Sequence, residues 1–169
     1  MRKLKLSRID PCSIVNGDGC RLIVVFSGCS LNCQGCFSKE LQDFNVGVDI
    51  SPDNLSQIIA DHISDTTLLD GITLSGGNPQ EQSDLLPFLK KVRGLMPKKF
   101  TIWMWSGFTM EEILKDSIKS KHLDYIDVII TGRYVESRKV EHTYFGSDNQ
   151  EVWRKTNDNW NKDDSGEEE

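Results

Sequence analysis

Short apolar runs alternate along this chain with segments whose apolar residues recur at helical spacing. The runs typical of strands cover residues 3–9, 21–26, 71–74, 100–105, 126–130 and 151–153. Helical periodicity falls between them, in residues 51–63, 85–92 and 109–118. Strands that alternate with helices in this way indicate βαβ units and a mostly parallel sheet, which right-handed crossovers would curl.

The length of the chain limits how far such a sheet can curl. A complete eight-stranded (β/α) barrel needs roughly 250 residues, whereas this chain has 169. We therefore predict an α/β fold in the form of an open, partial (β/α) barrel of about four to five βα units. Two helix starts support the assignment, because Ser51 reads as an N-cap and Thr109 with Glu112 reads as a capping box.

Three of the five cysteines lie within eight residues, directly after the apolar run 22–26. Cys29, Cys33 and Cys36 follow the spacing C-x3-C-x2-C. A loop at the end of a strand can aim three thiolates at one point, and thiolate sulfur suits zinc and iron–sulfur clusters. A cubane cluster normally takes four cysteines, so three of them would leave one iron open to a substrate.

A structural zinc site is the alternative interpretation of the same cysteines. It needs a fourth protein ligand, for which the chain offers His62, His122 and His142. His62 lies on the apolar side of a predicted helix and His122 in a polar connection, which leaves His142 as the plausible ligand. Cys12 and Cys20 have no motif partner and read as ordinary thiols, although Cys20 could approach the cysteine loop.

A glycine-containing segment, Ser-Gly-Gly-Asn-Pro, follows the next predicted strand at residues 75–79. Alone it indicates a tight βα turn, in which glycine permits positive φ and lets the backbone approach a neighbour closely. In sheets of this class, chemistry gathers at the C-terminal ends of the strands. The cysteines and residues 75–79 are both predicted at that edge.

The three-cysteine spacing after a strand resembles that of the radical S-adenosylmethionine (SAM) superfamily. Further segments narrow the resemblance to the family of activators of anaerobic (class III) ribonucleotide reductases: residues 16–21 (NGDGCR), 75–79 (SGGNP) and 146–150 (GSDNQ). The resemblance extends roughly from Ile9 to Trp153.

The resemblance implies a [4Fe–4S] cluster held by Cys29, Cys33 and Cys36, with the amino and carboxylate groups of SAM on the open iron. The SAM contacts that it implies are Gly35, Cys36 and Phe37 for the adenine and Ser75, Gly76, Gly77 and Asn78 for the amino group. Asn78 stands where the superfamily commonly has Glu, and an amide lacks the charge-assisted bond of a carboxylate to an ammonium. Backbone contacts are therefore expected to dominate, and core packing is the alternative for Phe37.

The implied activity is the generation of a glycyl radical on the large subunit of the reductase. The reduced cluster passes one electron to SAM, and the 5′-deoxyadenosyl radical that forms takes a hydrogen atom from a glycine of that subunit. The implied electron donor is a reductant protein such as one of the flavodoxin type, and no catalytic side chain beyond the cluster ligands is required. The alternatives are an activator of another glycyl-radical enzyme, a different radical SAM enzyme, and a non-catalytic iron–sulfur or zinc protein.

Charge and composition limit the partners and the location. The net charge is −6, but residues 158–169 hold six acids and one lysine, so the rest of the chain carries −1. Such a body lacks the clustered Lys and Arg that nucleic acids require. No apolar run reaches the length of a membrane span, and residues 1–8 lack the apolar stretch of a signal peptide. We expect a cytoplasmic protein without nucleic-acid or membrane partners, consisting of a radical SAM domain (1–156) and an acidic, disordered tail (157–169).

Several other residues lie near the ends of predicted strands. Trp103 and Trp105 share one face of a strand and are expected to fill the interior, with stacking against a substrate as the alternative. Arg133 and Arg138 either hold the SAM carboxylate, contact the partner protein or are ordinary surface charges. Residues 146–150 read as a turn, and the sequence assigns them no role.

Overall fold

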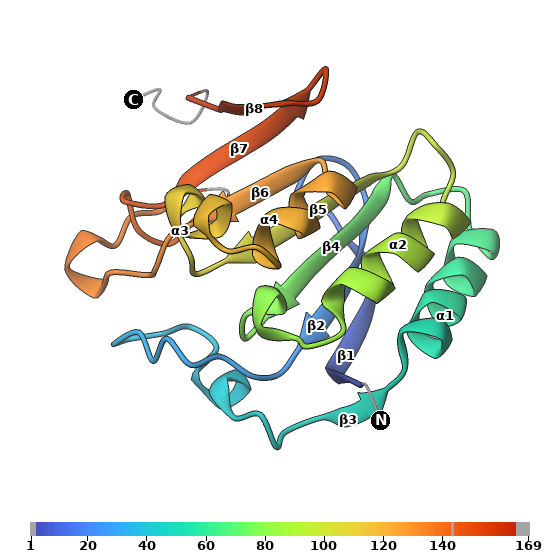
Figure 1. Cartoon of the computed structure of the whole chain (residues 1–169), viewed down its shortest axis with the longest axis horizontal. Helices are drawn as coiled ribbons and strands as arrows, with labels where there is room; N and C mark the ends of the chain where they lie inside the picture. Colours follow the sequence, from blue (N-terminus) through green and yellow to red (C-terminus); the bar gives the residue numbers. More distant parts are fainter. Residues whose placement is uncertain (1–2, 143, 165–169) are drawn as a thin grey trace.

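The computed structural model describes residues 3–142 and 144–164 and contains one eight-stranded sheet (Figure 1). The strands are β1 (Leu4–Ser13), β2 (Arg21–Phe26), β3 (Val48–Ile50), β4 (Gly71–Gly76), β5 (Thr101–Ser106), β6 (Val128–Thr131), β7 (Glu151–Thr156) and β8 (Asn159–Lys162). Their order across the sheet is β3-β1-β2-β4-β5-β6-β7-β8. The sheet is open, with β3 and β8 at its two ends.

Parallel pairing is confined to the middle of this sheet. Strands β2, β4, β5 and β6 pair in parallel, and the other four neighbouring pairs are antiparallel. The α/β class is thus confirmed, the prediction of a mostly parallel sheet is wrong, and the sheet does not confirm a barrel. The reason lies in the connections: helical crossovers link the four middle strands, whereas β1–β2, β6–β7 and β7–β8 are joined without an α-helix and return antiparallel.

Four α-helices accompany the sheet: α1 (Pro52–Ser64), α2 (Leu85–Leu95), α3 (Met110–Lys115) and α4 (Lys119–His122). The predicted starts are confirmed, because Ser51 caps α1 and Thr109 forms a complete capping box with Glu112. Helix α3 ends at Lys115 and is therefore shorter than predicted. The Asp116 carboxylate accepts the N–H groups of Ile118 and Lys119 and so begins a new turn, and the Ile118 side chain is exposed. Among the described residues, no helix has the length and apolar character needed to cross a membrane.

The helices cover one face of the sheet, where the larger hydrophobic core lies (Figure 1). Alternate residues of each strand contribute to it, as the period of a strand requires. In β2, Leu22, Val24 and Phe26 belong to this core, whereas Ile23 and Val25 belong to a small cluster on the other face. The six residues of β2 are all buried, so the strand that precedes the cysteines is central to the molecule.

On the face away from the helices, Trp103 belongs to a second buried cluster, which confirms that it fills the interior, whereas Trp105 is partly buried and packs against this cluster. The fully buried Arg21 lies over the Trp103 ring, 5.4 Å from its centroid. Its guanidinium donates to the hydroxyls of Thr73 and Thr101 and to three backbone carbonyls. Burial lowers the pKa of Arg21 to about 10, so the side chain stays charged at neutral pH. It ties β2, β4 and β5 together at the edge opposite the cysteine loop.

Strands β7 and β8 form a hairpin where the sequence predicts the start of a disordered tail. The turn residues Asn157 and Asp158 both have positive φ (49° and 63°), as a two-residue hairpin turn requires and as Asn and Asp tolerate. The predicted disorder from residue 157 is therefore wrong for Asn159–Lys162, and residues 165–169 of that tail lie outside the described residues. A domain boundary after Thr156 would cut through this hairpin.

Truncation after Thr156 is expected to lower the free energy of unfolding by about 1–2 kcal/mol, because it removes β8 and the half-buried Trp160 that packs against the core. Urea unfolding measures the change. The matched control ends at Asp164, keeps β8 and should unfold like the full chain. Equal stability of the two truncated chains would contradict a stabilising role of β8.

Candidate functional site

The cysteine loop, residues 27–37, leaves the C-terminal end of β2 and is anchored at its root. Gly28 and Cys29 donate their backbone N–H groups to the carbonyl oxygens of Leu41 and Gln42, at 2.8 and 3.0 Å. Each backbone bond of this kind fixes the path of the chain in a region without regular structure. The first of the three cysteines therefore has a defined place relative to the sheet.

The three thiols of the loop are free and half-buried. The Cys36 N–H donates to the Cys33 carbonyl oxygen at 3.2 Å, in a turn that brings the second and third cysteines together. Burial raises the pKa of the Cys29 thiol to about 11, and Glu81 adds to the rise. A thiol must lose its proton to become a ligand, so metal binding at Cys29 releases a proton.

The donor chemistry of the loop fits an iron–sulfur cluster, because three soft sulfur ligands share eight residues. Among the described residues, no three His, Cys, Asp or Glu side chains form a group that could hold a metal ion. A cluster would thus draw the thiols of the loop together.

The glycine loop, residues 75–79, is bonded to the cysteine loop through the backbone. The N–H groups of Gly77 and Asn78 donate to the carbonyl oxygens of Phe26 and Gly28, both at 2.9 Å. A Cβ atom on Gly77 would lie 2.5 Å from the Leu41 carbonyl oxygen and 2.6 Å from that of Gly28. The close backbone approach that the sequence predicts thus occurs, but against the cysteine loop. Contact of this loop with a ligand stays a prediction.

The first two residues of the glycine loop, Ser75 and Gly76, are also the last residues of β4. They pair in parallel with Val25 and Phe26 at the end of β2. The glycine loop and the cysteine loop therefore start side by side at the same edge of the sheet.

Asn78 is 1% exposed, and both polar atoms of its side chain are buried without a hydrogen-bond partner in the described structure. Leu31 of the cysteine loop and Asn78 both lie close to Gly107. Measured from the position that a Cβ atom would take on Gly107, the Asn78 Nδ2 is 3.8 Å away and a methyl carbon of Leu31 is 2.2 Å away. Burying an amide unpaired is costly. A polar ligand group placed against this amide would relieve the cost. The contact of Asn78 with a ligand, through its backbone or its side chain, stays a prediction.

Two further residues that tether the cysteine loop are not predicted from the sequence. The Glu81 carboxylate accepts the Ser30 N–H at 2.9 Å and also the Ser30 hydroxyl. Gln82 donates to the Ser27 carbonyl oxygen at 2.8 Å and accepts the Lys5 N–H at 2.8 Å. Each of these contacts spans more than 50 residues, and the local sequence Gln-Glu-Gln reads as an ordinary polar turn.

The loop after β6 reaches the cysteine loop from the other side. Gly35 has a φ of +72°, and the Glu136 carboxylate lies 2.7 Å from the position that a Cβ atom would take there. The Arg133 guanidinium pairs with both carboxylate oxygens of Glu112, at 2.9 and 3.1 Å. Glu112 is the main cause of the raised pKa of Arg133, and the Cys33 and Cys29 thiols add to the rise. Of the two predicted arginines, Arg133 pairs with Glu112 and Arg138 pairs with Asp148, the latter at 2.5 Å. A contact of either arginine with SAM or with the partner protein stays a prediction.

Phe37, directly after the third cysteine, is 100% exposed. The alternative of core packing is therefore wrong, because the ring contacts no core residue. Gly35 is also exposed, and Cys36 is half-buried. Their predicted contact with adenine remains a prediction.

Cys12 and Cys20 form a disulfide with a Cα–Cα distance of 5.9 Å, so the interpretation of both as ordinary thiols is wrong. The antiparallel pairing of Ser13 with Arg21 brings these two cysteines to the same end of the β1–β2 hairpin. Cys20 precedes β2 and the cysteine loop follows it, so the length of six extended residues, about 20 Å, separates them. The expectation that Cys20 could approach the cysteine loop is wrong.

The histidines considered for a zinc site lie in other surroundings. His142 stacks on Phe145 with ring centroids 3.7 Å apart, and its Nδ1 accepts the Tyr144 N–H. Burial lowers the pKa of His122 to about 4, and its Nδ1 lies 3.5 Å from the Gln80 amide. His62 is half-buried on α1.

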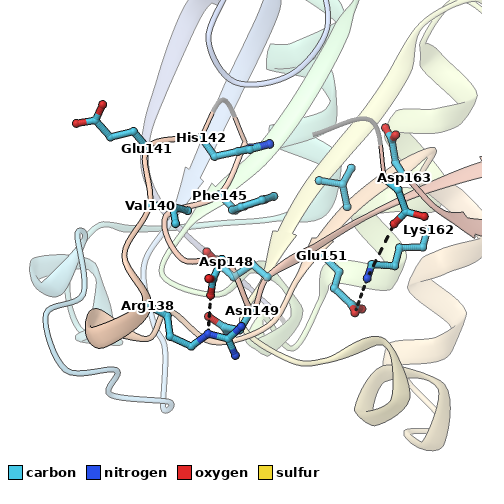
Figure 2. A pocket seen from close by; sticks show the side chains of 13 residues that line it. Arg138, Val140, Glu141, His142, Phe145, Asp148, Asn149, Glu151, Lys162 and Asp163 are labelled. Carbon is cyan, nitrogen blue, oxygen red and sulfur yellow. Dashed lines mark hydrogen bonds and ion pairs between the residues drawn. The ribbon is translucent and has the colours of Figure 1, made fainter. Parts of the chain in front are cut away.

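His142 and Phe145 line a cavity of about 520 Å³. Figure 2 shows these two side chains, with the Arg138–Asp148 ion pair nearby. None of the three cysteines and no residue of the glycine loop lines this cavity. The zinc alternative gains no support from this arrangement.

A family model described as a 4Fe-4S single cluster domain matches residues 15–153 of the chain. Three curated relatives are named anaerobic ribonucleoside-triphosphate reductase-activating protein. The protein of Enterobacteria phage T4 is 32% identical over 95% of this chain and 100% of its own length. That of Pasteurella multocida (strain Pm70) is 36% identical over 86% of this chain and 94% of its own. That of Escherichia coli (strain K12) is 35% identical over 84% of this chain and 93% of its own length.

Proposed function

Because the chain belongs to the family of the anaerobic ribonucleoside-triphosphate reductase-activating proteins and matches the 4Fe-4S single cluster model over residues 15–153, we propose that it activates an anaerobic ribonucleotide reductase. The activation consists of placing a glycyl radical on the large subunit of the reductase. The observation that carries the proposal is the loop with three free, half-buried thiols at the C-terminal edge of the parallel strands, beside a buried and unpaired amide.

In this proposal, Cys29, Cys33 and Cys36 would hold a [4Fe–4S] cluster, and SAM would bind beside it. When bound, the cluster supplies the single electron for reductive cleavage of SAM. The other residues of the site position the cluster and SAM, and a site that is already fixed needs no rearrangement during the reaction. The backbone anchors at Gly28 and Cys29 and the tether from Glu81 to Ser30 hold the ligands in place.

The remaining site residues are proposed to hold SAM. Ser75, Gly76 and Gly77 contribute backbone carbonyl oxygens, which are suitable acceptors for an ammonium group. The Asn78 amide, buried and unpaired, takes a polar group of the same ligand. Gly35, Cys36 and Phe37 contact the adenine, for which the exposed Phe37 ring offers apolar surface.

The partners and the location follow from the same reaction. Besides the reductase, the proposed partner is a reductant protein of the flavodoxin type, which delivers the electron to the cluster. A cytoplasmic location is proposed because the three ligand cysteines must stay reduced until they bind iron.

The test mixes the iron-reconstituted protein with its reductase, SAM and a reductant in the absence of oxygen. Electron paramagnetic resonance (EPR) should then show a glycyl radical on the reductase, and Cys36→Ala should give none. Efficient SAM cleavage without that radical would overturn the partner and favour another glycyl-radical or radical SAM enzyme. A cluster that never cleaves SAM would indicate a non-catalytic iron–sulfur protein, and a colourless protein with bound zinc would indicate a zinc protein.

A further inference from the structure

We propose that residues 146–150 are a positioning element for the cysteine loop. Through Asn149 and Gln150 they hold the strand-end loop, residues 132–138, and that loop braces the cysteine loop at Gly35. The proposal rests on the proposed function only in taking the cysteine loop as the site of the cluster.

Gln150 binds its own turn to the end of β6. Its side-chain oxygen accepts the N–H groups of Gly146 and Ser147, at 2.9 and 3.2 Å. Its side-chain nitrogen donates to the Gly132 carbonyl oxygen at 3.0 Å. The oxygen of this one amide therefore bonds the turn and its nitrogen bonds the end of β6, which couples the turn to the strand end.

The other residues of the element hold the strand-end loop farther along. Asn149 donates to the Arg133 carbonyl oxygen at 2.8 Å. The fully buried Ser147 accepts the Val135 N–H at 3.1 Å, and the Asp148 N–H donates to the Arg138 carbonyl oxygen at 3.1 Å. The strand-end loop is thus bonded at its start, middle and end by four consecutive residues, 147–150.

The strand-end loop carries this restraint to the cysteines through Glu136. The Glu136 side chain occupies the space beside Gly35 where another residue would have its Cβ atom. Gly35 directly precedes Cys36, and its positive φ sets the direction in which the chain enters that ligand. A strand-end loop that shifts would remove the brace from Gly35 and let Cys36 move, whereas Cys29 keeps its separate anchors at Gln42 and, through Ser30, at Glu81.

The first test measures the rate at which iodoacetamide labels each cysteine in the iron-free protein, read by peptide mass spectrometry. Asn149→Asp keeps the size of the side chain and removes the donor to Arg133. It should label Cys36 about three- to tenfold faster and leave Cys29 at the wild-type rate, because a thiol in a mobile loop is more accessible. An added carboxylate by itself would disfavour the reactive thiolate, so faster labelling would report release of the loop.

A second variant removes the brace without touching the positioning element. Glu136 is exposed, so Glu136→Ala should fold normally and should also speed the labelling of Cys36. Glu136→Gln is its matched control, because it removes the charge but keeps the length of the side chain, and it should label more slowly than Glu136→Ala. Asp148→Asn lies in the same element. Among the described residues its side chain bonds only Arg138, and an asparagine oxygen can still accept that bond, so this variant should behave like the wild type.

The second test uses the iron-reconstituted protein and records the EPR spectrum of the reduced cluster. Glu136→Ala should broaden this spectrum at unchanged thermal stability, and Asn149→Asp should broaden it as well. The spectra of the two control variants should match the wild-type spectrum. Wild-type labelling of Cys36 in both test variants would overturn the proposal, as would equal acceleration at Cys29 and Cys36, which indicates general loosening. The labelling needs neither the cluster nor the reductase. It therefore tests this proposal separately from the proposed function, including the case in which the wild-type protein places no radical on the reductase.

Discussion

Each of the variants Cys29→Ala, Cys33→Ala and Cys36→Ala is expected to lose the [4Fe–4S] cluster and the cleavage of SAM. The three thiols are free and share one anchored loop, so removing one leaves two sulfur ligands for a cluster that needs at least three. Iron and sulfide per chain after anaerobic reconstitution should fall to about a tenth of the wild-type value or less. Formation of methionine from SAM measures the cleavage.

The other two cysteines provide the control for this prediction. Cys12→Ala and Cys20→Ala break a disulfide at the far end of β2 and should keep both the cluster and the cleavage. A variant of the cysteine loop that assembled a complete cluster with normal SAM cleavage would show that its residue is not a ligand.

Gly77→Val is expected to lose iron as well as SAM binding. A Cβ atom at this position would lie 2.5 Å from the Leu41 carbonyl oxygen and 2.6 Å from that of Gly28, and the backbone at both places must move to admit it. Because Gly28 directly precedes Cys29, this movement displaces the first ligand. Overpacking of this kind should also lower the free energy of unfolding by about 1–3 kcal/mol.

Iron content and urea unfolding measure these effects, with Gly94→Ala as the control. A Cβ atom on Gly94, within α2, meets no atom within 4 Å, so this change should keep the iron and raise the stability by about 0.5–1 kcal/mol. Normal iron with weakened SAM binding in Gly77→Val would contradict the steric argument. It would mean that the glycine serves the ligand directly, as the sequence alone indicates.

Local patterns predict the elements of this fold better than their arrangement. The spacing of apolar residues and the caps at Ser51 and Thr109 locate α1 and the start of α3, and the spacing of the cysteines identifies the loop that matters. The direction of the outer strands depends on connections without helices, which periodicity alone does not reveal. The β7–β8 hairpin does have a local signal, because Asn157-Asp158 suits a two-residue turn, but the many acids nearby favour an interpretation as disorder.

The contacts that shape the site join parts of the chain that are far apart in the sequence. Glu81 bonds Ser30 across 51 residues, and Gln150 bonds Gly132 across 18. Neither residue belongs to a pattern with a known partner, so the sequence indicates a turn at residues 146–150 and nothing about what the turn holds. Only the folded chain reveals these pairs.

The two outermost strands bear on how copies of this chain behave beside one another. An open sheet ends in unpaired backbone groups, which invite another sheet to add on. Here β3 has three residues, and its Asp49 lies between Lys3 and Lys5. At the other end, β8 is four residues long and its Lys162 side chain pairs with Glu151. Short strands with charged side chains discourage edge-to-edge association, so the sheet can remain open without becoming a template for aggregation.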